Sequence, residues 1–198
     1  MSAEIEQAKL ALREQLRTDA RKISAAERQL ASAELCARLQ DQTVWQQARG
    51  VLLFWPLPDE PDVRPLATAG LTAGKLVALP RFDAVPGEYG AARITDPARD
   101  LMTGRFGVSE PAAHCPQVQL NHLDFVLVPG VAFDFAGGRL GRGKGYYDRL
   151  LALVPGMKCG AAFDAQVVAA VPREPHDVQL NCILTPTRWH PVVRPRQV

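Results

Sequence analysis

Residues 137–145 combine five glycines with three cationic side chains, those of Arg139, Arg142 and Lys144. Glycine lets backbone N–H groups approach a ligand because no Cβ stands in the way, and the cations would neutralise negative charge on that ligand. The leucine-rich residues that follow predict a helix beginning near Gly145, whose unpaired N–H groups and positive dipole end would face the loop. This stretch is therefore suited to binding an anion.

The spacing G-x-x-x-x-G-K of residues 138–144 is close to that of a nucleotide-binding P-loop. The next residue, however, is Gly145 and not the Ser or Thr that would hold magnesium. If a nucleotide binds here, another residue must hold its metal, and Asp148 is the nearest candidate. The alternative is a mobile surface loop whose arginines face water. We favour the anion site because so dense a cluster follows closely on a predicted strand, residues 125–128.

Ten consecutive residues, 139–148 (RLGRGKGYYD), resemble the signature of the 5-formyltetrahydrofolate cyclo-ligases. Members of this family use magnesium ATP to convert 5-formyltetrahydrofolate into 5,10-methenyltetrahydrofolate. The resemblance implies phosphorylation of the formyl oxygen, ring closure, and release of ADP and phosphate. It makes the loop the ATP site, with catalytic roles for Arg142 and Lys144. The implied ATP-binding residues of this loop are Arg139, Gly141, Arg142, Gly143, Lys144, Gly145, Tyr146 and Tyr147.

A second family feature, K-x-x-L-R, is matched near the N-terminus by Lys9, Leu12 and Arg13. Lys9, Arg13, Arg17 and Arg21 lie four residues apart, and none has an acidic residue four positions earlier to pair with. From the spacing alone we would favour a solvated helix face. The resemblance implies instead that Lys9 and Arg13 reach the ATP phosphates.

Residues 56–61 (PLPDEP) are predicted to leave the carboxyl end of a buried strand, the edge at which open α/β sheets bind ligands. A carboxylate there can orient a reacting nitrogen. Without the resemblance Glu60 would be a surface acid; with it, Glu60 contacts the folate and has a catalytic role. We assign further folate contacts to Trp55, Phe82 and Tyr147. Phe82 replaces the tyrosine usual in the family, which keeps a stacking face but loses a hydroxyl.

Residues 174–178 (EPHDV) resemble a family segment whose first aspartate serves the magnesium, so Asp177 joins Asp148 as a predicted metal ligand. Asn181 replaces a later aspartate of that segment. Residues 106–111 resemble a family turn that we expect to form pocket wall. The histidines and cysteines lack the spacing of zinc sites or hydrolytic motifs, and we expect the four cysteines to be reduced and mostly buried.

Hydrophobic periodicity predicts the elements that must position these residues. A capping-box pattern at residues 24–27 marks the start of the second helix. We expect helices at 4–21, 25–47 and 62–73, strands at 50–55, 75–79, 125–128, 158–163 and 182–185, an edge or hairpin strand at 91–95, a short helix or turn at 166–171, and a frayed tail at 189–198.

The chain has 198 residues, of which 47% are hydrophobic and 22% charged. We expect one three-layer α/β domain spanning residues 1–198, with a mostly parallel central sheet flanked by helices. The net charge of +2 is too small to indicate nucleic acid as the main partner. No apolar run is long enough for a membrane span, and the polar N-terminus lacks a signal peptide's apolar core. We therefore expect a cytoplasmic monomer that binds neither nucleic acid nor membrane.

Two other classes of function remain open from the residues alone. A sugar-phosphate isomerase or CoA-transferase-like enzyme could use a similar sheet and anion loop without ATP or a metal on Asp148. A nucleic-acid-binding module could use the Arg, Lys and Tyr residues of the loop for backbone and stacking contacts, and its binding would weaken steeply with salt.

Overall fold

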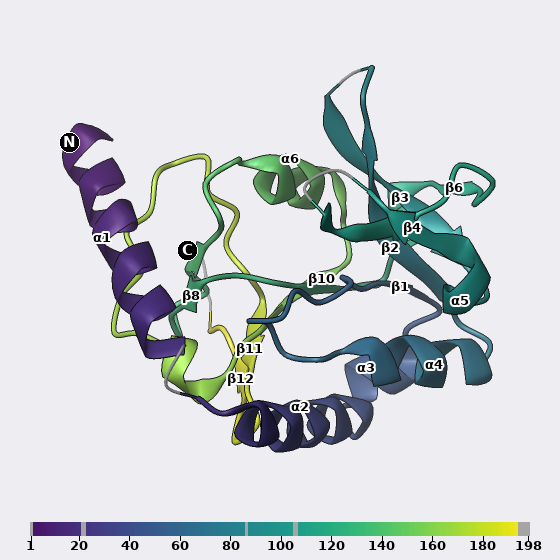
Figure 1. The fold of residues 1–198 in the computed structure, drawn as a ribbon, viewed down its shortest axis with the longest axis horizontal. Helices are drawn as coiled ribbons and strands as arrows, with labels where there is room; N and C mark the ends of the chain where they lie inside the picture. The colour runs from purple at the N-terminus through teal and green to yellow at the C-terminus, as the bar shows by residue number, and fades with distance from the viewer. Residues whose placement is uncertain (1, 21–22, 86, 105–106, 194–198) are drawn as a thin grey trace.

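A large mixed sheet dominates the computed structural model, which describes residues 2–20, 23–85, 87–104 and 107–193 (Figure 1). Within these residues eight strands form the sheet in the order β12-β11-β10-β7-β1-β2-β3-β6. The five central strands, from β11 to β2, are parallel, and β12, β3 and β6 are antiparallel to their neighbours. The strands are β1 (Gly50–Leu52), β2 (Leu76–Asp83), β3 (Glu88–Ile94), β6 (Gln117–Val118), β7 (Phe125–Val128), β10 (Met157–Ala161), β11 (Cys182–Leu184) and β12 (Trp189–Pro191).

The helices cover both faces of this sheet, as Figure 1 shows. Successive residues of a strand point to opposite faces, so Val51, Val77 and Leu127 pack with one group of helices while Leu52 and Val126 pack with α6 (Tyr146–Leu153). The predicted three-layer arrangement is confirmed. The first group of helices consists of α2 (Ala25–Gln40), α3 (Thr43–Gln47) and α4 (Arg64–Thr72).

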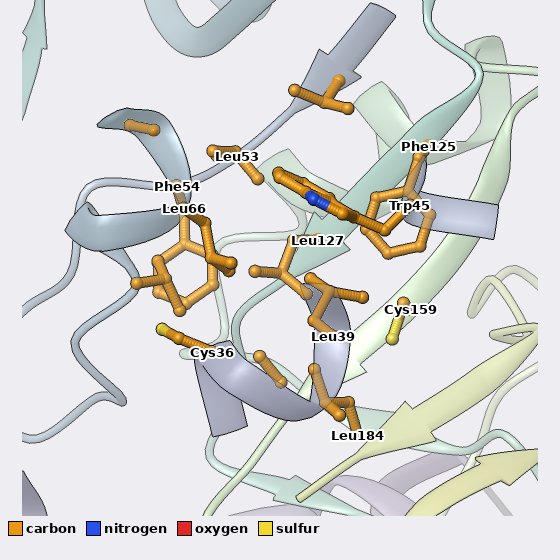
Figure 2. Close-up of a cluster of buried hydrophobic side chains, with 14 of the residues drawn as sticks. Cys36, Leu39, Trp45, Leu53, Phe54, Leu66, Phe125, Leu127, Cys159 and Leu184 are labelled. Atoms are coloured by element: carbon orange, nitrogen blue, oxygen red, sulfur yellow. The ribbon is translucent and has the colours of Figure 1, made fainter. Parts of the chain in front are cut away.

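The core between the sheet and these helices is apolar and closely packed (Figure 2). Trp45 of α3 meets Phe125 of β7 edge to face, with ring centroids 6.1 Å apart, and Leu39 of α2 is fully buried. Cys36, Cys115, Cys159 and Cys182 are buried free cysteines, as expected.

Beyond the carboxyl edge of the sheet lies a small hairpin, β8 (Ala132–Phe133) with β9 (Arg139–Leu140). The long N-terminal helix α1 (Ser2–Ala20) packs Leu12 and Leu16 against this hairpin and not against the main sheet. The remaining short elements are α5 (Pro97–Asp100), the β4–β5 pair (Leu101–Thr103 with Ser109–Pro111) and the 3-10 turns η2 (Leu120–His122) and η3 (Asp164–Gln166).

Several predicted boundaries are wrong. The second helix ends at Gln40, where Asp41 caps it, and α3 follows as a separate helix. The second strand does not stop at Pro80 but runs to Asp83; β1 pairs with β2 only as far as Ala78, so a residue without an N–H is tolerated beyond that point. Residues 189–191 form β12 and not a frayed tail.

The other predicted elements are present at slightly different bounds, except the short helix or turn predicted at 166–171. A 3-10 turn lies earlier, at Asp164–Gln166, and Val167 forms a β-bridge with Phe133 instead. The first strand ends at Leu52 and the one predicted at 158–163 ends at Ala161. The capping box of Ser24 and Glu27 is confirmed. Arg21, Phe106 and residues 194–198 lie outside the described residues. None of the helices described is both long and apolar enough for a membrane crossing.

Candidate active site

The chain reverses direction across the sheet between β1 and β7. From β1 it crosses through α4 to β2, and from β7 it crosses through α6 to β10 on the other side. The loops that leave the carboxyl ends of these two strands therefore diverge, and ligands of open α/β sheets bind in the crevice between such loops. A cavity of about 640 Å³ lies here, lined by residues of both loops.

Every predicted site residue except Phe82 lines this cavity. Segments far apart in the sequence, including α1 and residues 176–177, meet at it. The predicted residues found there are Lys9, Arg13, Trp55, Glu60, Arg139, Gly141, Arg142, Gly143, Lys144, Gly145, Tyr146, Tyr147, Asp148 and Asp177.

The glycine-rich segment is more structured than a plain loop. Its first part is strand β9, and only residues 141–145 form the turn that leads into α6. Gly143 and Gly145 have φ angles of 97° and 64°, which residues with a Cβ rarely adopt. No side chain caps the N-terminus of α6, so its first N–H groups are suited to a bound anion.

Arg139 is buried in the cavity wall. Its Nη2 donates to Asp148 Oδ1 at 2.8 Å and its Nη1 to the Pro129 carbonyl at 3.3 Å, while the guanidinium lies over the Tyr147 ring at 5.8 Å. Among the buried side-chain nitrogens and oxygens described, only its Nε lacks a hydrogen-bond partner. An unsatisfied buried donor on a cation is costly unless a ligand satisfies it, which fits an anionic ligand.

Helix α1 reaches the cavity through two cations. Lys9 Nζ donates to Asp177 Oδ2 at 2.7 Å and to Glu174 Oε2 at 2.9 Å, and Arg13 Nε donates to the Gly141 carbonyl at 3.0 Å. Burial opposes the charge of Lys9, but hydrogen bonds and charges from the two carboxylates outweigh it and raise the pKa of Lys9. Lys9 and Arg13 are thus fixed at the cavity, and their contact with a nucleotide remains a prediction.

Arg142 spans the two loops. Its Nη2 donates to Asp59 Oδ1 at 2.7 Å and to Glu60 Oε1 at 3.1 Å. Only 7% of the Glu60 side chain is exposed. Burial raises the pKa of Glu60, although the Leu57 N–H and the Arg142 charge oppose that rise. Asp59 was not predicted as a site residue, and its place beside Glu60 on the loop after β1 was the only sequence signal.

Part of the cavity wall is aromatic. The rings of Phe82, Tyr89 and Tyr146 meet edge to face, with centroids 5.3 to 5.6 Å apart. Phe82 packs behind the two tyrosines that line the cavity. Desolvation, and next the charge of Glu60, raise the pKa of Tyr147 far above its usual range.

The sequence analysis did not predict Tyr89 as a site residue, and it expected Glu110 only as part of the pocket wall. Tyr89 lies directly opposite Phe82 in the β2–β3 register, and its hydroxyl donates to Glu110 Oε1 at 3.1 Å. The Phe82 N–H donates to Glu110 Oε2 at 3.0 Å. Glu110 belongs to the turn expected as pocket wall, and it lines the cavity as a buried carboxylate.

The two predicted metal ligands both line the cavity, each in an ion pair: Asp148 with Arg139 and Asp177 with Lys9. Among the described residues, Asp100, His114 and Cys115 form the only close group of three potential metal ligands. None of these three lines the cavity, and the Asp100 carboxylate already accepts hydrogen bonds from its neighbours.

Comparison with known proteins identifies relatives of this chain. The model of the 5-formyltetrahydrofolate cyclo-ligase family matches residues 5–186. A 5-formyltetrahydrofolate cyclo-ligase of Mycolicibacterium smegmatis is 35% identical over 71% of this chain and 75% of its own length. One from Escherichia coli K12 is 30% identical over 87% of this chain and 97% of its own length. The solved structure of 5,10-methenyltetrahydrofolate synthetase from Aquifex aeolicus superposes with a TM-score of 0.85 at 33% identity, covering 96% of this chain and 95% of that one.

Proposed function

Because this chain belongs to the 5-formyltetrahydrofolate cyclo-ligase family, we propose that its cavity binds ATP and 5-formyltetrahydrofolate side by side and converts the folate into 5,10-methenyltetrahydrofolate. The observation that supports this proposal best is that one cavity is lined by two kinds of group. Cations and glycine N–H groups suit phosphates, and aromatic rings with buried carboxylates suit a folate ring.

The chemistry explains why ATP is needed. The formyl carbon on nitrogen 5 is a weak electrophile because the nitrogen lone pair is delocalised into the carbonyl. In the proposed reaction the formyl oxygen attacks the γ-phosphorus and ADP leaves, which turns that oxygen into a good leaving group. Nitrogen 10 then attacks the activated carbon and loses its proton, and the carbon–oxygen bond breaks to release phosphate. The product is the methenyl cation.

Phosphoryl transfer of this kind requires positioning and charge neutralisation more than covalent chemistry from the protein. We assign phosphate contacts to Arg139, Arg142 and Lys144, with Lys9 and Arg13 approaching from α1. The N–H groups of the turn at residues 141–145 would add donors.

We assign folate contacts to the remaining residues at the cavity. Glu60, at the end of the β1 loop, would accept hydrogen bonds from folate nitrogens near the reacting centre. Trp55, Tyr146 and Tyr147 would stack against or enclose the ring, and Phe82 would support the tyrosines from behind. Both buried carboxylates, Glu60 and Glu110, favour a ligand that carries N–H donors and becomes a cation.

The carboxylates of the cavity also fit Mg²⁺. Proteins usually hold this ion through one or two carboxylates together with substrate phosphates and waters, and Asp148 and Asp177 supply such oxygens. When bound, Mg²⁺ would neutralise charge on the polyphosphate. Arg139 and Lys9, which pair with these aspartates, would then be available to the phosphates.

The test is near-ultraviolet absorbance of the purified protein mixed with 5-formyltetrahydrofolate, magnesium and ATP. The methenyl product has an extended chromophore that the substrate lacks. We expect a rise in absorbance that needs both ATP and protein. No rise from folded protein would contradict the proposal and direct attention to sugar phosphates as the anionic ligand.

A further inference from the structure

A single nitrogen atom of Arg142 connects the glycine-rich turn with the loop after β1. Nη2 donates to Asp59 and to Glu60, which lie 83 and 82 residues earlier in the chain, on the loop after β1. The side chain assigned to phosphate is therefore bonded to the side chain assigned to folate. In the structure neither is fully available to its substrate.

Both oxygens of Glu60 are engaged. Oε2 accepts the Leu57 N–H at 3.0 Å, a contact within its own turn, and Oε1 accepts from Arg142. A folate N–H that takes the place of Nη2 on Oε1 must compete with Arg142. A phosphate that takes the N–H groups of Nη2, and not only the other donors of Arg142, likewise draws them from Glu60, and this leaves a nearly buried carboxylate short of a partner, which is unfavourable until a new donor arrives.

We propose that ATP and folate binding are positively coupled by exchange of the partners of Arg142, and that Asp59 is a positioning residue in this exchange. The inference rests on the proposed function. ATP withdraws Arg142 from Glu60 and makes Oε1 available to the folate, and by thermodynamic linkage the folate favours ATP by the same factor. Asp59, which is half-exposed and bonded to Arg142, competes with Glu60 for the guanidinium and so weakens the contact that folate must break.

The experiment is calorimetric titration of 5-formyltetrahydrofolate into the protein, with and without saturating magnesium β,γ-imido-ATP, an analogue that cannot transfer its phosphoryl group. We expect the wild-type protein to bind the folate at least about fivefold more tightly with the nucleotide. In Glu60→Gln this ratio should fall to about one, because a neutral amide holds Arg142 weakly.

Asp59→Asn tests the exchange of Arg142 partners more specifically than Glu60→Gln does. Glu60 then becomes the main partner of Arg142, so folate affinity without nucleotide should fall about two- to fivefold, the scale of an exposed ion pair. With nucleotide it should match the wild type. A purely structural role for Asp59 would weaken both affinities together. Lys144→Ala is the matched control, because it removes a cation assigned to phosphate without touching Glu60, and at saturating nucleotide it should keep the wild-type ratio.

Equal folate affinity with and without nucleotide in the wild-type protein would overturn the inference, as would a Glu60→Gln protein with the wild-type ratio. The absorbance assay on the same preparations separates this failure from failure of the proposed function. If product forms but the ratio is one, only the coupling is wrong. If no product forms, the proposed function fails and the coupling falls with it.

Discussion

At the scale of single residues, the burial of Glu60 opposes its ionisation. Glu60 is nearly buried at the cavity where we propose that it contacts the folate, and this burial raises its pKa. Since the folded-state pKa lies above that of an unfolded glutamate, the folded protein binds more protons between the two values. Its stability therefore falls as the pH rises through this window. Ionised Glu60 is a cost to the fold that a functional role would explain.

Glu60→Gln removes this cost. We expect the variant to melt at a slightly higher temperature than the wild type at neutral pH, with the difference shrinking as the pH falls through the raised pKa of Glu60 toward the ordinary glutamate value. Folate turnover should fall at least about tenfold, whereas the ATP analogue should bind at least as tightly as in the wild type, because its phosphates no longer compete with a carboxylate for Arg142. Melting curves across pH and titrations with each ligand would check this, and equal loss of both ligands would point to a structural role instead.

Substitution of Asp148 tests its proposed role as a magnesium ligand. In Asp148→Asn the amide oxygen can still accept from Arg139 Nη2, so we expect the fold to persist. The loss of one anionic ligand should raise the magnesium concentration needed for half-maximal rate by roughly tenfold. The control is Asp164→Asn, because Asp164 is exposed on η3 and away from the cavity. An unchanged magnesium titration in Asp148→Asn, measured at fixed total ATP, would remove Asp148 from the metal site.

At the scale of elements, the turn at residues 141–145 depends on backbone conformations that favour glycine. Gly143 has a φ of 97°, and a Cβ there would lie 3.6 Å from the Arg13 guanidinium. Gly143→Ala should destabilise the protein by about 1–2 kcal/mol and weaken ATP binding by roughly tenfold or more, because the displaced turn can no longer present its N–H groups.

The matched control is Gly74→Ala. Gly74 has a φ of 72° and no atom within 4 Å of an added Cβ, so it shares the backbone strain but lies outside the cavity. The melting temperature of Gly74→Ala should fall by about as much as that of Gly143→Ala, while the KM for ATP stays at the wild-type value. If both variants change the KM alike, the effect of Gly143→Ala comes from stability alone.

The sequence predicted elements better than their connections. Continuous apolar runs located every central strand, and helical periodicity located the main helices, because burial imposes those patterns directly. The hairpin of β2 and β3 was harder, since Pro80 marked an end that the structure does not have. That register places Tyr89 opposite Phe82 and beside Glu110, so the missed part of the aromatic wall depended on a pairing that the chain does not signal locally.

At the scale of the whole molecule, the cavity joins the two ends of the chain. Lys9 of α1 contacts Glu174 and Asp177, which are 165 and 168 residues away. Spacing alone favoured a solvated face for this helix. Only the family resemblance predicted that Lys9 reaches the site, because a contact between such distant segments depends on how the intervening strands are arranged in the sheet.

Lys9→Met should therefore affect both stability and ligand binding. It keeps the apolar stem but leaves two mostly buried carboxylates without their cation, so we expect a loss of roughly 3 kcal/mol. The effect should be largest near neutral pH. It should shrink above about pH 10.5, because the raised pKa of Lys9 means that its contribution is lost as the pH rises through the folded-state value. It should also shrink in acid, because the pKa of Asp177 is lowered and its contribution is lost as the pH falls through that value.

The control is Arg17→Met, two turns along the same helix and exposed, which should change little. Hydrogen exchange gives the decisive readout. In the wild type, magnesium ATP should slow exchange in α1 and in residues 174–177 together, because the ligand connects both segments to the glycine-rich turn. In Lys9→Met that shared protection should be lost while α6 remains protected. If α1 in Lys9→Met responds to ATP as in Arg17→Met, then α1 is held at the cavity by Leu12, Leu16 and Arg13 alone, and Lys9 has no part in binding the nucleotide.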